Sequence, residues 1–145
     1  MSVDAKGRLA LPARYRERIL EAAAGAVVLT INPRDLCLWL YPLPEWEQIE
    51  AKLATLPDFD KPTRRIKQMM RGYAQDCELD TQGRILISQE LRSIAGIDRK
   101  VILSGQGNKF EVWNEDTWTR ARDEWIADID NKDGEPSQAL ESLSF

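Results

Sequence analysis

A ten-residue segment near the start of the chain occurs again 76 positions later, counted from Asp4 to Asp80. The first copy (Val3–Pro12) reads VDAKGRLALP, and the second (Leu79–Ser88) reads LDTQGRILIS. Asp, Gly and Arg keep their places, and alternating residues around them are apolar. This pattern predicts strand, tight turn and strand, because glycine adopts positive φ and aspartate accepts hydrogen bonds from turn amides. One copy would indicate only a hairpin with a charged tip, whereas two copies favour a functional role.

The similarity between the copies continues beyond the turns. Val27–Thr30 corresponds to Val101–Ser104 with an offset of 74 residues, and Trp46 corresponds to Trp118 with an offset of 72. Because the offset changes only in loops, we infer that one unit was duplicated: a hairpin, a short helix, two strands and a helix. A unit this short can form only a marginal core alone, so the copies are expected to share one core or to rely on contacts between subunits.

We predict a first repeat over residues 1–46, linker helices over 47–72, a second repeat over 73–118, and a C-terminal helix with an acidic tail over 119–145. Periodicity, prolines and glycines predict strands and helices within them. The strands are expected over residues 26–31, 36–41, 73–79, 85–87, 101–104 and 110–113, and the helices over 12–25, 44–56, 63–71, 91–95 and from 114 onward. Apolar spacing predicts a core-facing side on three of the helices. These sides comprise Tyr15, Ile19, Leu20 and Ala23, then Trp46, Ile49, Leu53 and Leu56, and finally Trp118, Ala121, Trp125 and Ile129.

The residue types that are missing exclude several classes of function. The chain contains no histidine, which rules out Ser-His-Asp and Cys-His catalysis and most zinc sites. It has no P-loop or dinucleotide-binding glycine pattern, so we expect no enzyme, cofactor or metal. No run of about twenty apolar residues is present and a charge comes at Asp4, so neither a membrane span nor a signal peptide is expected. Cys37 and Cys77 are expected to be buried free thiols in a cytoplasmic protein.

Charge is unevenly distributed along the chain. The sequence has 20 basic and 24 acidic residues, a net charge of −4. Residues 123–141 carry seven acidic residues and one lysine, whereas the turns are basic, as is a segment with Lys61, Arg64, Arg65, Lys67 and Arg71. This segment fits either the solvated face of a linker helix or a nucleic-acid contact. An acidic chain can still bind DNA if oligomerisation gathers its basic turns on one face.

Four segments together carry a resemblance to a known family. They are the two Asp-x-x-Gly-Arg turns, Leu40–Trp46 (LYPLPEW) and Gly105–Trp113 (GQGNKFEVW). The chain resembles the MraZ family of bacterial transcription regulators, in the wider group with AbrB-type swapped-hairpin DNA-binding domains, from Val3 to about Ile129. The resemblance implies an α+β fold of two tandem AbrB-like β-barrel modules, related by pseudo-twofold symmetry and packed with helices.

The resemblance also implies a function and an assembly. Members of the family bind double-stranded DNA at repeated operator elements ahead of the bacterial division and cell-wall gene cluster. They do so as homo-oligomers, ring-like in form, and the implied location is the cytoplasm, in association with the nucleoid. Weak binding by each subunit is multiplied by repeated sites.

Matching positions in the two motifs carry the implied DNA contacts. The DNA-facing residues would be Lys6, Arg8 and Arg84, and the residues that brace the turns would be Asp4, Gly7, Asp80 and Gly83. Arginine can bind guanine or phosphate through two nitrogens, and lysine adds a point charge. Gln82 stands where the first motif has Lys6, so the second turn is expected to contribute less affinity.

The two copies also differ ahead of the motif. A full strand is predicted before the second copy, whereas the first has only Met1 and Ser2 ahead of it. Family members usually start several residues earlier. The first repeat is therefore expected to lack the equivalent strand and to leave a sheet edge open.

Other interpretations stay open at this stage. The same fold could serve an antitoxin-like or scaffolding protein that binds a protein partner. A carboxylate-dependent enzyme would need two converging acids, which the sequence does not indicate. Finally, Arg8 and Arg84 could pair with Asp4 and Asp80 inside their own turns, which would assign the motif to the fold alone.

Overall fold

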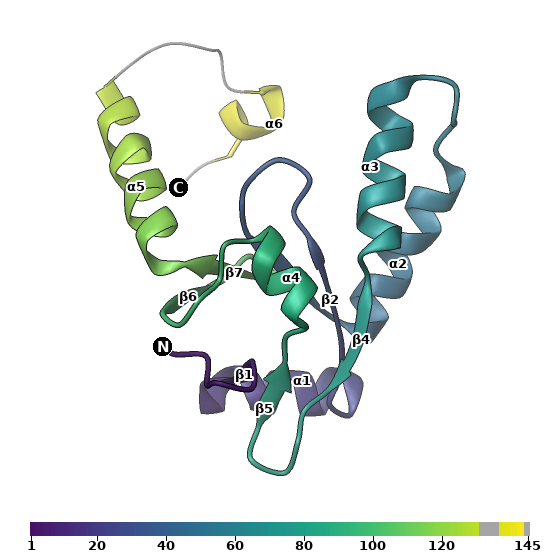
Figure 1. Ribbon diagram of the computed structural model, residues 1–145. Coiled ribbons are helices and arrows are strands. Elements are labelled where there is room, and N and C mark those ends of the chain that lie inside the picture. Colours follow the sequence, from purple (N-terminus) through teal and green to yellow (C-terminus); the bar gives the residue numbers. More distant parts are fainter. Residues whose placement is uncertain (131–136, 144–145) are drawn as a thin grey trace. The chain divides into compact units, whose positions relative to one another are not determined.

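The computed structural model describes residues 1–130 and 137–143 of the chain. The helices are α1 (Ala13–Ala23), α2 (Leu43–Thr55), α3 (Lys61–Gly72), α4 (Gln89–Ile94), α5 (Glu115–Ala127) and α6 (Gln138–Glu141), with a 3-10 turn η1 (Asp128–Asp130). The strands are β1 (Arg8–Ala10), β2 (Ala26–Ile31), β3 (Leu38–Pro42), β4 (Gln75–Glu78), β5 (Arg84–Leu86), β6 (Val101–Gly105) and β7 (Phe110–Asn114) (Figure 1). Two compact units are distinguished, Met1–Glu115 and Asp116–Phe145, and the first contains every strand found among the described residues.

Antiparallel strands form two sheets in the first unit. The larger sheet has the order β4-β2-β3-β7-β6, and the smaller is a ladder of β1 and β5. β3 comes from the first copy and β7 from the second, and they pair at the centre of the larger sheet. The expectation of two β-barrel modules therefore needs correction: the described strands form open sheets that both copies share, with no closed barrel among them. Each copy supplies strands that pair with strands of the other instead of closing on itself.

Where the two copies pair, equivalent residues lie opposite each other. In the ladder, Leu9 lies opposite Ile85, its equivalent 76 positions later. In the larger sheet, Leu38 lies opposite Val112, its equivalent 74 positions later. β2 pairs with β3 in the first copy as β6 pairs with β7 in the second. One mixed α+β unit thus contains both copies, with matching strands in matching places.

The first copy has only a remnant of the strand that precedes the second motif. In the second copy β4 pairs with β2 over four residues. In the first, Ser2 forms a single bridge with Lys100, and the N–H of Val101 donates to the carbonyl oxygen of Met1 at 3.0 Å. The Ser2–Lys100 bridge occupies the place that the pairing of Glu78 with β2 takes in the second copy. Most of the outer edge of β6 therefore has no strand beside it in the described structure.

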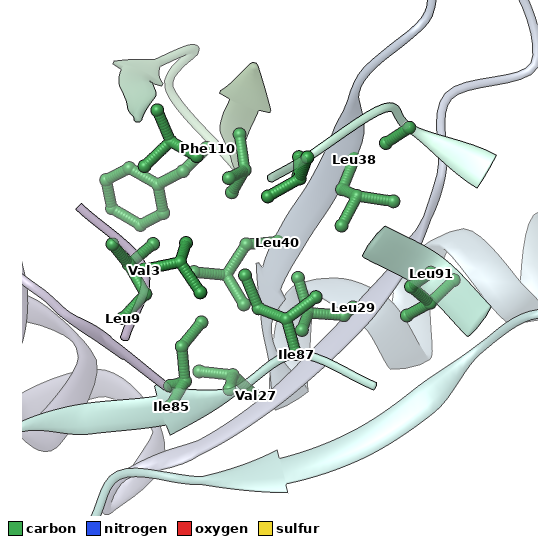
Figure 2. Close-up of a cluster of buried hydrophobic side chains, with 14 of the residues drawn as sticks. Val3, Leu9, Val27, Leu29, Leu38, Leu40, Ile85, Ile87, Leu91 and Phe110 are labelled. Atoms are coloured by element: carbon green, nitrogen blue, oxygen red, sulfur yellow. The ribbon is translucent and has the colours of Figure 1, made fainter. Parts of the chain in front are cut away.

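One hydrophobic core contains side chains from both copies. Its members come from both sheets and from α4, and include Val3, Leu9, Val27, Leu29, Leu38, Leu40, Ile85, Ile87, Leu91 and Phe110 (Figure 2). Truncating a fully buried leucine to alanine costs about 2–5 kcal/mol. Damage to the core residues of one copy is therefore expected to destabilise the other copy as well.

A second cluster covers the opposite face of the larger sheet. Neighbouring residues of a strand point to opposite faces, so Val28 and Tyr41 face away from the shared core and toward α2 and α3. The cluster comprises Val28, Tyr41, Trp46, Leu53 and Met70. The helices predicted for the linker segment thus pack against the sheet of the first unit.

Local sequence explains where several helices begin. Pro12 precedes α1, where the lack of an N–H is tolerated. Asp60 accepts a hydrogen bond from the N–H of Thr63 at the start of α3. Ser88 accepts one from the N–H of Leu91 at the start of α4, as predicted from its position. Such caps each contribute about 1 kcal/mol.

Apolar spacing overestimated how much of the helices is buried. Leu20, Leu56, Trp125 and Ile129 are exposed at 54%, 40%, 47% and 76%, so the expectation that they face a core is wrong. On α1 the buried position belongs to Ile19, and its neighbour Leu20 is rotated about 100° around the helix from it. The predicted acidic tail falls partly on residues 131–136 and 144–145, which lie outside the described residues.

The two thiols lie in different surroundings. Cys37 is buried and Cys77 is half-buried, and both are free. Burial raises the pKa of Cys37 to about 12 and that of Cys77 to about 11. Both thiols are therefore protonated at neutral pH. No helix in the described ranges has the length and apolar character needed to cross a membrane.

Candidate nucleic-acid interface

The first turn is closed by its own aspartate. The backbone N–H groups of Lys6 and Arg8 donate to Oδ1 of Asp4 at 2.9 and 2.8 Å, and Nε of Arg8 donates to Oδ2 at 2.7 Å. The N–H of Asp4 donates to the carbonyl of Arg8 at 2.9 Å, and that of Gly7 donates to the carbonyl of Asp4 at 3.0 Å. One carboxylate therefore fixes both the backbone of the turn and the orientation of the guanidinium group.

The second turn repeats this arrangement. The N–H groups of Gln82 and Arg84 donate to Oδ1 of Asp80 at 2.9 and 2.8 Å, and Nε of Arg84 donates to Oδ2 at 2.8 Å. The backbone bonds from Asp80 to Arg84 and from Gly83 to Asp80 measure 2.9 and 3.0 Å. The two turns share one local structure, with or without a lysine at the tip.

The hydrogen bonds stabilise the ionised form of both aspartates. The backbone N–H of Arg8 is the largest influence that holds the pKa of Asp4 below its ordinary value of 3.8. The backbone N–H of Arg84 does the same for the pKa of Asp80. Ion pairing with the guanidinium groups adds to this effect in both turns. The carboxylates are therefore charged, and act as acceptors only, at neutral pH.

Both turn glycines adopt backbone angles that other residues avoid. Gly7 has a φ of 87° and Gly83 a φ of 73°. A Cβ at Gly7 would lie 2.8 Å from the carbonyl oxygen of Ile87, and one at Gly83 would collide with the side chain of Arg16. Glycine is therefore required at both places by backbone angle and by space.

Hydrogen bonds connect each turn to the strand that leaves the other turn. The N–H of Ile87 donates to the carbonyl of Gly7 at 2.8 Å, and the N–H of Leu11 donates to the carbonyl of Gly83 at 3.0 Å. Between these two bonds runs the ladder of β1 and β5. Figure 1 shows both strands side by side, although they are far apart in sequence. The two turns are therefore parts of one structure.

The ladder brings the two predicted DNA-binding arginines to a common outer face. Leu9 and Ile85 are 0% and 1% exposed, so they form the inner face. Strand alternation places Arg8 and Arg84 on the outer face. Arg8 lies opposite Leu86 and Arg84 opposite Ala10, so the arginines occupy diagonal positions, with side chains 33% and 25% exposed.

The tips of the turns differ in charge. Lys6 and Gln82 occupy equivalent positions and both are exposed. Their backbone N–H groups make the same bond to the turn aspartate, at 2.9 Å in each case. The side chain at this position therefore has no role in holding the turn, and the substitution changes only what the surface offers to a partner.

Sequence analysis missed one arginine of each helix that follows a ladder strand. Arg16 on α1 lies against Gly83, with Nη1 3.4 Å from the carbonyl oxygen of Gln82. Arg92 on α4 lies against Gly7, and its Nε donates to the carbonyl of Ile87 at 3.1 Å. Each helix thus supports the turn of the other copy. The signal was present, since these arginines are also 76 positions apart, but spacing alone does not reveal a partner in the other copy.

The basic segment on α3 is only partly available to a partner. Nζ of Lys67 donates to the carbonyl of Leu56 and to Oδ1 of Asp58, both at 2.8 Å, and its side chain is 11% exposed. Lys67 therefore closes the link between α2 and α3 and has a structural role. Arg71 lies 3.9 Å from Glu50, a distance at which an exposed ion pair contributes little. The other three cations, Lys61, Arg64 and Arg65, are exposed.

Within the described residues, no group of three His, Cys, Asp or Glu side chains is arranged to hold a metal ion. The arrangement that the structure offers is a charged, two-stranded surface with rigid turns at its ends. Such a surface can donate hydrogen bonds to an anionic or acceptor-rich partner through guanidinium groups whose orientation is already fixed.

Comparison with known proteins gives a consistent result. The family described as "MraZ protein, putative antitoxin-like" matches twice, over residues 1–69 and 70–137. The chain is 51% identical over its full length to the transcriptional regulator MraZ of Thioalkalivibrio sulfidiphilus, 47% to that of Halorhodospira halophila and 46% to that of Klebsiella pneumoniae. In each case it covers 95% of the relative.

Proposed function

This chain belongs to the MraZ family, and on that premise we propose that it regulates transcription by sequence-specific binding of double-stranded DNA. Relatives with about half of their residues in common are named transcriptional regulators. We assign the DNA contacts to Arg8 and Arg84, with Lys6 as an additional cation on one side only. The turns are held for this contact by Asp4, Gly7, Asp80 and Gly83.

The observation that carries the proposal is the pair of arginines on one face of a two-stranded antiparallel ladder. The major groove of B-DNA admits a two-stranded ribbon, and arginine recognises guanine O6 and N7 through two nitrogens. In each turn the aspartate binds Nε. The two terminal nitrogens of each guanidinium are outside that bond and can donate to a base edge or a phosphate. The ion pair inside the turn and a contact with DNA are thus compatible.

We propose further that the copies are AbrB-like modules related by pseudo-twofold symmetry. The symmetric registers at Leu9–Ile85 and Leu38–Val112 support this. With a net charge of −4, a single chain has little overall attraction for DNA, so binding as a ring-like homo-oligomer to repeated operator elements supplies the affinity. The target we propose is the region ahead of the bacterial division and cell-wall gene cluster, in the cytoplasm and on the nucleoid.

The test measures operator affinity and folding stability on the same variants. Candidate operators are fragments of the DNA upstream of the protein's own gene, and Arg8→Ala and Arg84→Ala are compared with Arg34→Ala, an exposed arginine in the turn between β2 and β3. Loss of a base contact costs about 1–3 kcal/mol per engaged site and weakens the sequence preference. Loss of a phosphate contact weakens binding to all sequences evenly and reduces the salt dependence.

Both alanine variants should keep most of their stability, and the Arg34 control should bind as the parent does. Lost stability with unchanged DNA affinity would contradict the proposal and assign the arginines to the fold. A chain that shifts no DNA fragment at all would favour the second candidate, an antitoxin-like or scaffolding protein with a protein partner. The description of the matching family as antitoxin-like is the observation that keeps this candidate.

A further inference from the structure

A hollow beside α1 gathers three basic side chains and no acidic one. Residues of α1 and of the turn that joins β6 to β7 form its walls. It is lined by Arg14, Tyr15, Arg18, Gly105, Gly107, Lys109 and Phe110. Its volume is about 350 Å³, within the range of sites that hold small ligands.

The two arginines of α1 are held on aromatic rings. The guanidinium carbon of Arg14 lies 4.6 Å from the ring centre of Tyr15, and Arg14 donates to the Tyr15 hydroxyl at 2.8 Å. The guanidinium carbon of Arg18 lies 5.8 Å from the ring centre of Phe110. The two rings pack against each other with centres 4.8 Å apart. An aromatic face orients a cation without neutralising it.

Lys109 completes the group from the other wall. Its Nζ lies 4.8 Å from the ring centre of Trp39 and 3.5 Å from Oδ1 of Asn108. Among the described residues, no carboxylate lies within ion-pair distance of any of the three cations. Glu45 lines an adjoining hollow together with Arg18. The three cations that line the hollow therefore have no bound counter-charge among the described residues.

The other copy shows that the fold does not require this charge. The offsets of 76 and 74 residues give the position that corresponds to each of the three cations. Those positions hold Glu90, Ile94 and Asp35. Two acids and an apolar residue thus replace three bases on the same backbone framework. The hollow takes its arginines from the first copy and its lysine from the second. Its basic charge is thus present at only one of the two equivalent places in the fold.

We propose that this hollow binds a phosphate group. Guanidinium groups bind phosphate oxygens in a forked geometry, and an ammonium adds a point charge. The phosphate has two candidate sources, a free phosphorylated small molecule or the backbone of bound DNA. The inference does not depend on DNA contact at the ladder, because the hollow and the outer face of β1 and β5 have no lining residue in common.

The first arm of the test uses inorganic pyrophosphate alone. The full-length protein is titrated and binding is followed by calorimetry and by amide chemical shifts. Arg18→Gln and Lys109→Gln should each weaken binding about tenfold, the effect of one charge-assisted bond. Arg34→Gln removes a charge of the same sign from the corresponding turn of the other copy and should have no effect. Arg14→Lys keeps the charge but loses the fork, and thermal midpoints verify that each variant is folded.

The second arm measures DNA affinity against salt concentration for the same variants. If pyrophosphate does not bind but each substitution reduces the salt slope by about one, the phosphate is that of DNA. If pyrophosphate binds and the DNA slopes are unchanged, the ligand is a free phosphorylated molecule. If neither measurement responds, the proposal is overturned. If the parent protein binds pyrophosphate but no DNA, the phosphate site is supported and the proposed DNA-binding function is contradicted.

Discussion

The turns Asp4–Arg8 and Asp80–Arg84 have the same hydrogen bonds but different surfaces and different supports. Corresponding distances within the two turns agree to within 0.1 Å. Aspartate, glycine and arginine are the same in both, whereas the exposed tip is lysine in one and glutamine in the other. The aspartate, glycine and arginine that hold the turn backbone are identical in the two copies, whereas the exposed residue at the tip differs. The comparison therefore separates what folds the turn from what the turn presents to a partner.

The largest difference is expected between alanine substitutions of the two turn glycines. Gly7→Ala should lower the free energy of unfolding by about 2–4 kcal/mol. A positive φ is unfavourable for alanine, and the nearest atom to the new Cβ would be the backbone oxygen of Ile87. Gly83→Ala should cost about 1–2 kcal/mol, because its obstacle is the flexible side chain of Arg16. Urea unfolding at neutral pH measures both, and equal costs would show that the supports of the two turns are equivalent.

The supporting arginines should differ next. Arg92→Met is expected to cost about 1–2 kcal/mol, since it leaves the carbonyl of Ile87 without the bond from Nε at 3.1 Å. Arg16→Met should cost less than about 0.5 kcal/mol. The bond from Nη1 of Arg16 to the carbonyl of Gln82 is long, at 3.4 Å, and its buried Nε has no hydrogen-bond partner in the described part of the chain. Methionine keeps the apolar stem in both variants. The free energies of unfolding decide the matter, and a larger loss at Arg16 would be the contrary result.

Exchange of the two tip residues tests the difference in charge. Lys6→Gln should weaken DNA binding by about 1 kcal/mol and lower the salt slope by about one, and Gln82→Lys should do the reverse. The double variant carries both changes, restores the total charge and should bind close to the parent level. Neither substitution should alter stability, because the side chain at this position does not hold the turn. Affinity unchanged in both single variants would remove the tips from the interface.

The smallest effect concerns pH, and here the two turns should behave alike. The folded-state pKa values of Asp4 and Asp80 lie below the ordinary 3.8. Each carboxylate therefore contributes stability above the unfolded pKa, and this contribution disappears as the pH falls below 3.8 through the folded pKa. Asp4→Asn and Asp80→Asn should each be less stable than the parent at neutral pH. The free energy of unfolding is measured from pH 7 to pH 2. The difference between each variant and the parent should decrease as the pH falls, with the same pH dependence for both variants.

Local features of the fold were predicted from sequence more accurately than long-range ones. The strand at Ala26–Ile31 was predicted with the bounds that the structure has, because a run of apolar residues between glycine and proline determines it. The bonds to Asp4 and Asp80 follow from residues within one turn, and Ser88 capped α4 as its position indicated. In these cases the determinant lay within a few residues of the element, and the pattern was sufficient.

The sequence could not reveal which strands of the two copies would pair. Spacing does not distinguish β1 paired with β5 from β1 paired within its own copy. The resemblance implied two β-barrel modules, whereas the described strands form open sheets that both copies share. For the same reason the contact of Arg16 with the turn at Gly83 was missed, although the helix was predicted. On α1 both Ile19 and Leu20 were expected to face the core, and only Ile19 is buried, because an apolar stripe does not tell how wide the contact with the core is.

The unlike tips at Lys6 and Gln82, together with a basic hollow that has no basic counterpart at the equivalent place, make the two ends of the ladder different. A protein with two identical halves can approach a site in either of two orientations with equal energy. This chain has a more basic end and a less basic one on a nearly symmetric frame, so the two orientations differ in energy. If the chain binds tandem DNA sites as proposed, successive molecules would then lie in the same orientation along the DNA.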